Sequence, residues 1–165
     1  MIRAAIFNTV KDKDNSPVFE QFTLKTIIQK SNTILKYGLV KVIKYVRLFS
    51  DENGDSRFGE VEVPLGDSGP IGYLSDRYEV KDIQFRINDA DYDWDFHNAP
   101  ARQFIILLDG EIEITTSLGE IRKFSGGDIL LVEDTTGKGH RTRNVRQQVR
   151  RSVFIRLAGD NSQSG

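Results

Sequence analysis

The chain has 165 residues and no cysteine, with 23 lysines and arginines against 24 aspartates and glutamates. This length suits one domain with a sizeable core, and the net charge of −1 creates no global field that would indicate nucleic acid or a membrane surface. Without cysteine, any metal site must use nitrogen and oxygen ligands. No apolar run approaches the roughly 20 residues of a membrane span, and the start of the chain lacks a secretory apolar region. We therefore expect a cytoplasmic protein.

The apolar residues between Val18 and Tyr37 recur at the spacing of an amphipathic helix. Pro17 is tolerated in a first helical turn, and Gly38 can end the helix. We predict a helical extension over residues 1–38, which would cover the main domain or lie in a dimer interface, with a disordered leader as the alternative. The main domain is expected over residues 39–160, followed by a polar tail over residues 161–165.

Most of the remaining chain alternates apolar and polar residues with a period of two, which predicts short strands. The predicted strands cover residues 40–49, 58–63, 78–87, 102–108, 111–116, 120–124, 128–132, 140–144 and 149–158. Residues 88–95 carry four aspartates in alternation, but they lack the glycine and the distant glutamate of a calcium loop, so we interpret them as a solvated turn. Many short strands separated by glycine turns predict an all-β sandwich or barrel, such as a jelly roll.

The strand over residues 102–108 is apolar on both faces except at Gln103, which predicts a central strand covered on both sides. By alternation, Gln103, Ile105 and Leu107 share one of its faces. The chain has only two histidines, His97 and His140, and they lie on either side of this strand in the sequence. In a small barrel, these polar residues can face one cavity.

The segment between these histidines resembles the two motifs of the cupin superfamily. His97 matches the first histidine of the first motif, Gln103 stands in the place of its glutamate, and Gly110 matches its closing glycine. In the second motif, Gly127 matches the opening glycine and His140 matches the histidine. The resemblance covers about residues 80–158 and extends to a subgroup of single-domain cupins. It implies a double-stranded β-helix, a jelly-roll barrel.

The family site holds a divalent metal with three histidines and one glutamate, and this chain departs from it. Ala99 replaces the second histidine, Gln103 replaces the glutamate, and the Pro-x-Gly step before the last histidine is missing. What remains for a metal is His97, Gln103 and His140. The resemblance implies that these three could hold Fe, Mn, Ni or Zn weakly, and an inward-facing Asp95, Glu133 or Asp134 would strengthen the site.

The alternative keeps the same three residues as a polar, catalytic cluster without a metal. His97 or His140 would act as general acid or base, because an imidazole titrates near neutral pH. Gln103 would donate or accept a hydrogen bond with the ligand. Both interpretations remain open at this point.

Further candidate substrate-binding residues surround this cluster. Trp94, Phe96 and Tyr92 could form an aromatic wall, although simple core packing explains Trp94 and Phe96 equally well. Arg102 either pairs with Glu133 or Asp134 or binds a substrate carboxylate. The candidate set is completed by three residues that could lie near the cavity or its mouth: Ile105, Lys138 and Thr142.

These residues predict a protein that binds a small molecule in its barrel. We expect an enzyme of isomerase, cyclase, lyase or oxygenase type, and the alternative is a non-catalytic ligand-binding or sensing barrel with an incomplete metal site. Exposed β edges and the N-terminal segment favour a homodimer. The arginines between residues 141 and 151 lack accompanying aromatic residues, so we expect no nucleic-acid partner and no membrane partner.

Overall fold

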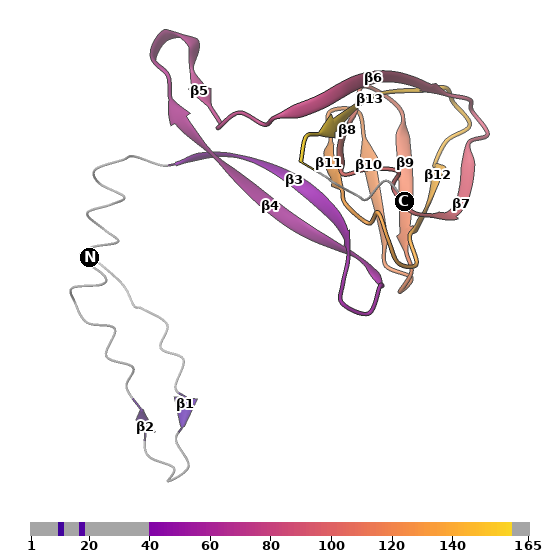
Figure 1. The fold of residues 1–165 in the computed structure, drawn as a ribbon, viewed down its shortest axis with the longest axis horizontal. Helices are drawn as coiled ribbons and strands as arrows, with labels where there is room; N and C mark the ends of the chain where they lie inside the picture. Colours follow the sequence, from indigo (N-terminus) through magenta and orange to yellow (C-terminus); the bar gives the residue numbers. More distant parts are fainter. Residues whose placement is uncertain (1–9, 12–16, 19–39, 160–165) are drawn as a thin grey trace, which may run out of the picture. The chain divides into compact units, whose positions relative to one another are not determined.

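The computed structural model describes residues 10–11, 17–18 and 40–159 of the chain (Figure 1). The chain divides into two units, and the described part of the first unit, residues 1–40, is one antiparallel pair of two-residue strands, β1 (Val10–Lys11) and β2 (Pro17–Val18). The predicted helix over residues 18–37 lies outside the described residues except for Val18, which belongs to β2. The predicted polar tail also lies outside them.

The second unit begins at Lys41 and is built almost entirely of strands. A 3-10 turn, η1 (Gly69–Ile71), is the only helical element that the described residues contain. The strands are β3 (Lys41–Ser50), β4 (Ser56–Asp67), β5 (Tyr73–Leu74), β6 (Val80–Asn88), β7 (Asp93–His97), β8 (Gln103–Leu107), β9 (Glu111–Thr116), β10 (Ile121–Ser125), β11 (Ile129–Val132), β12 (His140–Asn144) and β13 (Arg150–Leu157).

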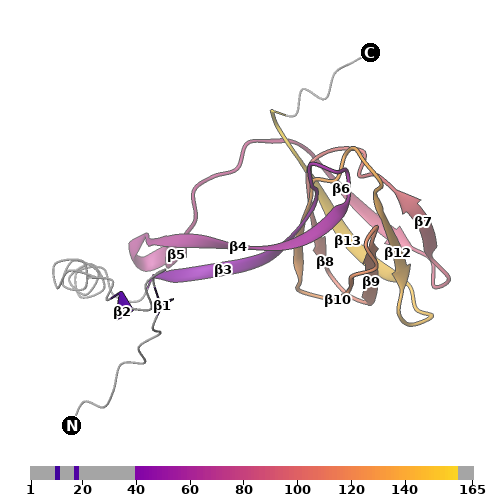
Figure 2. The same cartoon turned by 90° about the horizontal axis from the view of Figure 1, so that it is seen from below.

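These strands form two sheets that enclose the interior of a barrel (Figure 2). The first sheet has four strands in the order β10-β9-β12-β7, and the second has seven in the order β5-β4-β3-β11-β8-β13-β6. Neighbouring strands pair antiparallel except β3 and β11, which pair parallel. Because β6 and β7 are the edge strands of their sheets and are joined by a short turn, the barrel is open between them.

The strands β3 and β4 form a long hairpin that leaves the barrel as a twisted ribbon (Figures 1 and 2). Its turn is closed by Asp51, whose backbone N–H donates to the carbonyl of Asp55 at 2.8 Å, and Gly54 adopts a φ of 75° that glycine allows without strain. At the barrel end of the hairpin, Leu48 is fully buried. This end of the hairpin is therefore part of the barrel core, whereas its far end exposes Val42 and Ile43.

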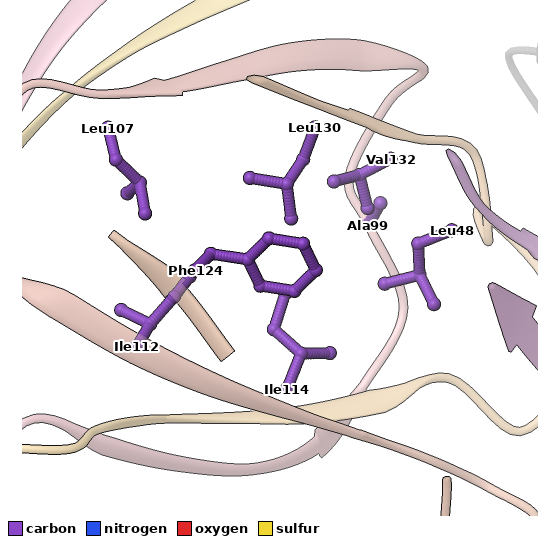
Figure 3. Close-up of a cluster of buried hydrophobic side chains, with 8 residues drawn as sticks. All are labelled: Leu48, Ala99, Leu107, Ile112, Ile114, Phe124, Leu130 and Val132. Atoms are coloured by element: carbon purple, nitrogen blue, oxygen red, sulfur yellow. The ribbon is translucent and has the colours of Figure 1, made fainter. Parts of the chain in front are cut away.

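The core lies between the two sheets around the ring of Phe124 (Figure 3). Side chains from both sheets meet there because alternate residues of each strand point inward. The buried cluster consists of Leu48, Ala99, Leu107, Ile112, Ile114, Phe124, Leu130 and Val132. Burying one such leucine stabilises the fold by about 1.5–3 kcal/mol.

The strand predicted over residues 102–108 is confirmed as β8, which lies between β11 and β13 in the middle of its sheet. The predicted face is also confirmed: Gln103 and Leu107 are both buried, at 4% and 1% exposure. Phe104 lies on the opposite face, in a second buried cluster with Leu131 and Leu157. Apolar side chains on both faces of β8 therefore pack against other apolar side chains.

The interpretation of residues 88–95 as one acidic turn is wrong at its end, because β7 begins at Asp93. Arg141 on β12 donates two hydrogen bonds to the Asp93 carboxylate, at 3.0 and 2.6 Å. This cross-strand ion pair compensates the negative charge of Asp93, and that charge was the reason for interpreting the segment as a turn. The alternating residues Trp94 and Phe96 supply the β propensity.

The strand β6 has the opposite orientation from that expected of a half-buried strand. Its apolar residues Ile83, Phe85 and Ile87 are 54%, 79% and 69% exposed. Its polar residues Gln84, which is exposed, and Arg86, which is partly buried, line a cavity of the barrel, and so does Phe85. The side of β6 that carries Arg86 therefore adds polar groups to the cavity, whereas most of the apolar surface of this edge strand is exposed.

Within the part of the chain that the structure describes, no helix is long and apolar enough to cross a membrane.

We expect Leu130→Ala to lower the free energy of unfolding by about 2–5 kcal/mol, because it removes a fully buried side chain and leaves a cavity in the core. Chemical denaturation measures this change. Leu118→Ala is the control, since Leu118 is 53% exposed and its loss should cost under about 0.5 kcal/mol. Equal costs for the two variants would contradict the core assignment.

Candidate functional site

A cavity of about 610 Å³ lies between the two sheets, and residues from both sheets line it. This volume is within the usual range for small-molecule sites. The walls are mostly apolar, with Ile105, Ile112, Ile114, Val132 and Phe154 among them. Polar side chains gather in two groups at different places in this wall.

The first polar group contains both histidines. His140 on β12 is the direct cross-strand partner of His97 on β7, and their ring centroids lie 4.5 Å apart. His140 is only 5% exposed, whereas His97 is partly exposed. Gln103, from the opposite sheet, lines the same cavity. We call His97, His140 and Gln103 the histidine cluster.

A break in the register between β7 and β12 decides which residues of β7 face the cavity. His97 pairs with His140 and Trp94 pairs with Thr142. Between these two pairs β7 advances by three residues while β12 advances by two, so β7 contains one extra residue. An extra residue of this kind reverses the side-chain alternation. As a result, Trp94 and His97 face the same side and their rings stack, with centroids 4.1 Å apart and planes 10° from parallel. The Trp94 ring therefore holds the imidazole of His97 in place.

Asp134 orients His140 from behind. Its carboxylate is fully buried, and the Oδ2 atom lies 2.6 Å from Nδ1 of His140. Its backbone carbonyl accepts hydrogen bonds from the Asn98 side chain, at 3.0 Å, and from the N–H of Ala99, at 3.2 Å. The segment after β7 and the segment after β11 are thus joined next to the cavity.

The hydrogen bonds of both rings determine which nitrogen is available for chemistry. Nδ1 of His97 lies 2.7 Å from the carbonyl oxygen of Asp95, which can only accept, so Nδ1 carries the proton and donates it. Nδ1 of His140 donates to Asp134 by the same reasoning, because two lone pairs would repel at this distance. In each neutral ring, Nε2 then has a free lone pair that can accept a proton.

The surroundings of His97 favour its neutral form. Burial is the largest cause that lowers the pKa of His97 below its ordinary value of 6.5, and the neighbouring His140 lowers this pKa further. The hydrogen bond to the Asp95 carbonyl and the charge of Asp134 act in the opposite direction. His97 is therefore neutral, and able to accept a proton, at neutral pH.

The structure brings three of the six predicted substrate-binding residues to this cavity. Trp94, Ile105 and Thr142 line it together with the histidine cluster. Three other predicted residues, Phe96, Arg102 and Lys138, are not among its lining residues.

The placement of each of these three residues has a local cause. Phe96 is 49% exposed because it is next to His97 on β7, and neighbouring side chains of a strand point to opposite faces. Arg102 pairs with the carboxylate of Glu133, which was one of the two interpretations of this residue. Lys138 donates to Oδ1 of Asp55 at 2.8 Å, and this fixes the loop before β12 to the β3–β4 turn.

A second polar group contains Arg86, Arg150 and Tyr92. The sequence interpretation missed its two arginines and proposed only Tyr92, as part of an aromatic wall. All three line the cavity, and each guanidinium carbon lies over the Tyr92 ring, at 5.2 Å for Arg86 and 5.3 Å for Arg150. We call them the arginine cluster. Alternation along β6 placed Arg86 with Gln84, but only the sheet pairing reveals that this face is internal. Asp134 also entered the sequence interpretation only as one of several carboxylates.

The donor atoms of the histidine cluster test the predicted metal. Two imidazole Nε2 atoms and one amide oxygen are available, and no carboxylate lines the cavity. The described residues contain no group of three or more His, Cys, Asp or Glu that could hold a metal ion. This donor set does not fit a tightly held divalent cation, because it has only two imidazoles and one neutral amide oxygen and no anionic ligand. Weak binding of Fe, Mn, Ni or Zn stays a prediction.

Two packed sheets with a lined cavity between them form an all-β barrel, and the all-β fold expected from the sequence is confirmed. No family model matches the chain, and no curated protein matches it.

Several solved structures are similar in fold. The cupin domain of Cnp3 from Schizosaccharomyces pombe is 11% identical, with a TM-score of 0.41, and the match covers 76% of this chain and 88% of that one. Drosophila melanogaster CENP-C, in a structure bound to CAL1, is 10% identical with a TM-score of 0.36, covering 81% and 100% of the two chains. The capsular polysaccharide assembling protein CapF from Staphylococcus aureus is 9% identical with a TM-score of 0.35, covering 71% and 32%.

Gly139 lets β12 approach β7 closely, and we expect Gly139→Ala to disrupt the histidine cluster. Its φ is +68°, and an added Cβ would lie 2.3 Å from the backbone carbonyl oxygen of His97. The left-handed conformation alone costs roughly 1–2 kcal/mol for a residue with a Cβ. The steric conflict adds to this cost, so chemical denaturation should give a clearly larger loss.

Gly119→Ala is the matched control for this variant. Gly119 also has a positive φ, +83°, but an added Cβ there would meet nothing within 4 Å. It should therefore show only the cost of backbone strain. If the two variants lose the same stability, Gly139 does not determine the approach of the two strands.

We expect the His97 ring to titrate below pH 6.5, which NMR of the ring nitrogens measures directly. Because folding favours the neutral form, the unfolded chain takes up this proton at a higher pH than the folded chain does. The stability that His97 contributes is therefore complete above about pH 6.5 and is lost as the pH falls towards the folded pKa. His97→Gln should remove this part of the pH dependence. A folded midpoint at or above that of the denatured protein would contradict the analysis.

Proposed function

We propose that this protein binds a small molecule in the barrel cavity and transfers a proton on it, as isomerases, cyclases and lyases do. The observation that carries this proposal is the buried pair of Asp134 and His140, in which His140 lines the cavity beside His97 and Asp134 supports it from behind. A carboxylate that accepts from Nδ1 keeps Nε2 as the basic atom and stabilises the imidazolium that forms when Nε2 takes a proton. This arrangement supports a role for His140 as general base and then general acid.

His97 and Gln103 complete the proposed site. His97 is partly buried, its pKa is lowered mainly by burial, and its ring is held by Trp94, which suits a second group that exchanges a proton with the ligand. Gln103 presents a side-chain amide, which can donate to a carbonyl oxygen or accept from a hydroxyl. Two proton-accepting nitrogens close together would permit removal of a proton at one atom and its return at another.

The second candidate function is a non-catalytic ligand-binding or sensing barrel. The incomplete donor set favours it over a metal-dependent enzyme, because two imidazoles and one amide do not hold a divalent metal tightly. The predicted homodimer and the cytoplasmic location stay predictions. The exposed apolar residues Ile83, Phe85 and Ile87 of β6 are a surface on which a second copy could pack.

Trp94 is the only tryptophan of the chain and lines the cavity, so its fluorescence reports ligand binding. A panel of small keto acids and keto sugars would be titrated this way. Each compound that binds would then be incubated with the protein in D₂O, with and without EDTA, while NMR follows exchange of the protons next to its carbonyl group. We expect at least one bound compound to exchange these protons, and EDTA to leave the rate unchanged.

His140→Asn should lower the exchange rate by about 10²-fold or more, as expected for the loss of a general base, while binding changes little. Lys123→Gln is the control, because Lys123 is exposed on β10 and does not line the cavity. Bound compounds that never exchange would support the non-catalytic barrel instead. Exchange that is abolished by EDTA would indicate a metal and overturn the proton-transfer mechanism as stated.

A further inference from the structure

The arginine cluster lies apart from the histidine cluster, at the other end of the cavity. On β12, His140 belongs to the histidine cluster, while Asn144, four residues further along, accepts a hydrogen bond from Nε of Arg150 at 3.1 Å. Four residues of a strand span roughly 13 Å. On β13 the same order holds, since Arg156 pairs with Gln103 whereas Arg150 pairs with Asn88.

Arg150 is held in place at this end of the cavity. It is only 3% exposed, and Asn144, which accepts from its Nε, itself donates to the carbonyl of Asp89 at 2.9 Å. The ring of Tyr92, which also lines the cavity, lies next to the guanidinium. A guanidinium with a fixed Nε keeps its terminal nitrogens in a defined direction, which suits recognition of a planar or tetrahedral anion.

Neither guanidinium of the arginine cluster is neutralised by a carboxylate. Within the described ranges, no Asp or Glu oxygen lies within 4.0 Å of a nitrogen of Arg86 or Arg150 to form an ion pair. Asp109 is the nearby acidic group whose charge acts on Arg150, but its carboxylate is bound by Arg151 at 2.6 Å. No carboxylate lines the cavity either, so its two charged lining residues are both cations.

A buried cation without a counter-ion lowers the stability of the folded protein, and two observations at Arg150 reflect this unfavourable environment. Burial lowers the pKa of Arg150, and the charge of Arg86 lowers it further. Two buried polar atoms next to the arginines also lack a hydrogen-bond partner: Oγ of Ser152 and Oδ1 of Asn88. Ser152 pairs across the sheet with Arg86, and Asn88 pairs with Arg150, so all four lie on the same face of β6 and β13. An anionic group bound by the arginines would compensate their charge, and the Ser152 hydroxyl could donate to it.

From this geometry we infer that the ligand of the cavity is an organic acid, a carboxylate or a phosphate ester, whose anionic group binds Arg86 and Arg150. This inference rests on the proposed function, because it specifies the ligand of the same cavity. The apolar wall between the two clusters, formed by Phe154, Ile112 and Ile114, contacts the body of the ligand. The end of the ligand away from its anionic group then lies at the histidine cluster.

The test uses three probes that share one apolar body: 3-phenylpropionate, 3-phenylpropyl phosphate and the uncharged 3-phenylpropanamide. Trp94 fluorescence measures the binding of each to the full chain. We expect at least one of the two anions to bind about tenfold or more tightly than the amide, as a charge-assisted hydrogen bond with a buried arginine would produce. Whichever anion shows the larger preference identifies the carboxylate or the phosphate ester as the ligand class.

Arg86→Gln and Arg150→Gln should each reduce this preference to about threefold or less while the affinity for the amide stays the same. Arg151→Gln is the control, because Arg151 is exposed, pairs with Asp109 and does not line the cavity. Arg150 is buried and its substitution can prevent folding, whereas Arg86 is only partly buried, so Arg86→Gln decides the test alone if necessary.

Equal binding of the anions and the amide by the unchanged protein would overturn the inference, and so would a preference that Arg86→Gln leaves intact. In both cases the amide still binds, so the cavity remains a ligand site and the proton-exchange experiment still decides the proposed function. If none of the three probes binds at millimolar concentration, the anion site is rejected. The proposed function then rests on the keto compounds alone.

Discussion

The buried carboxylate of Asp134 is the constraint on which the rest of the site depends. Its Oδ2 accepts from His140, and its backbone carbonyl accepts from Asn98 and Ala99, so one residue fixes the segments that follow β7 and β11. Of the residues that the structure describes, His140 is the one partner of the buried carboxylate, because the other carboxylate oxygen, Oδ1, is buried without a hydrogen bond. Because the carboxylate requires a donor, His140 must present Nδ1–H to it and Nε2 to the cavity. The chemistry available in the barrel follows from this single pairing.

The second constraint is the register break between β7 and β12. It brings Trp94 and His97 to one face although they are three residues apart, whereas Phe96, next to His97, points outward. Gly139 makes the close approach of the two strands possible, because no Cβ fits beside the His97 carbonyl. The stacked pair of rings is thus a product of strand pairing and of a missing side chain, and neither is visible in the alternation of β7.

The cavity combines two kinds of polar end with an apolar middle. The histidine cluster offers proton-accepting nitrogens, and the arginine cluster offers positive charge without a counter-ion among the described residues. A ligand that fits both ends has an anionic group, an apolar body and a polar reacting end. The separation of the clusters along β12 and β13 means that binding energy at the arginines can position a reacting group at His140, which is how remote contacts contribute to catalysis.

The sequence by itself determined most of the strands, though not β5 or β7, as well as the central place of β8 and three residues that line one cavity, His97, Gln103 and His140. Hydrophobic alternation and turn residues report these features, because they depend on neighbours close in the chain. Only the tertiary structure decided that Asp134 supports His140, that Lys138 binds Asp55, and that the polar face of β6 is internal. These features depend on which strands pair and in which register, and a local pattern contains no information about a partner that lies many residues away.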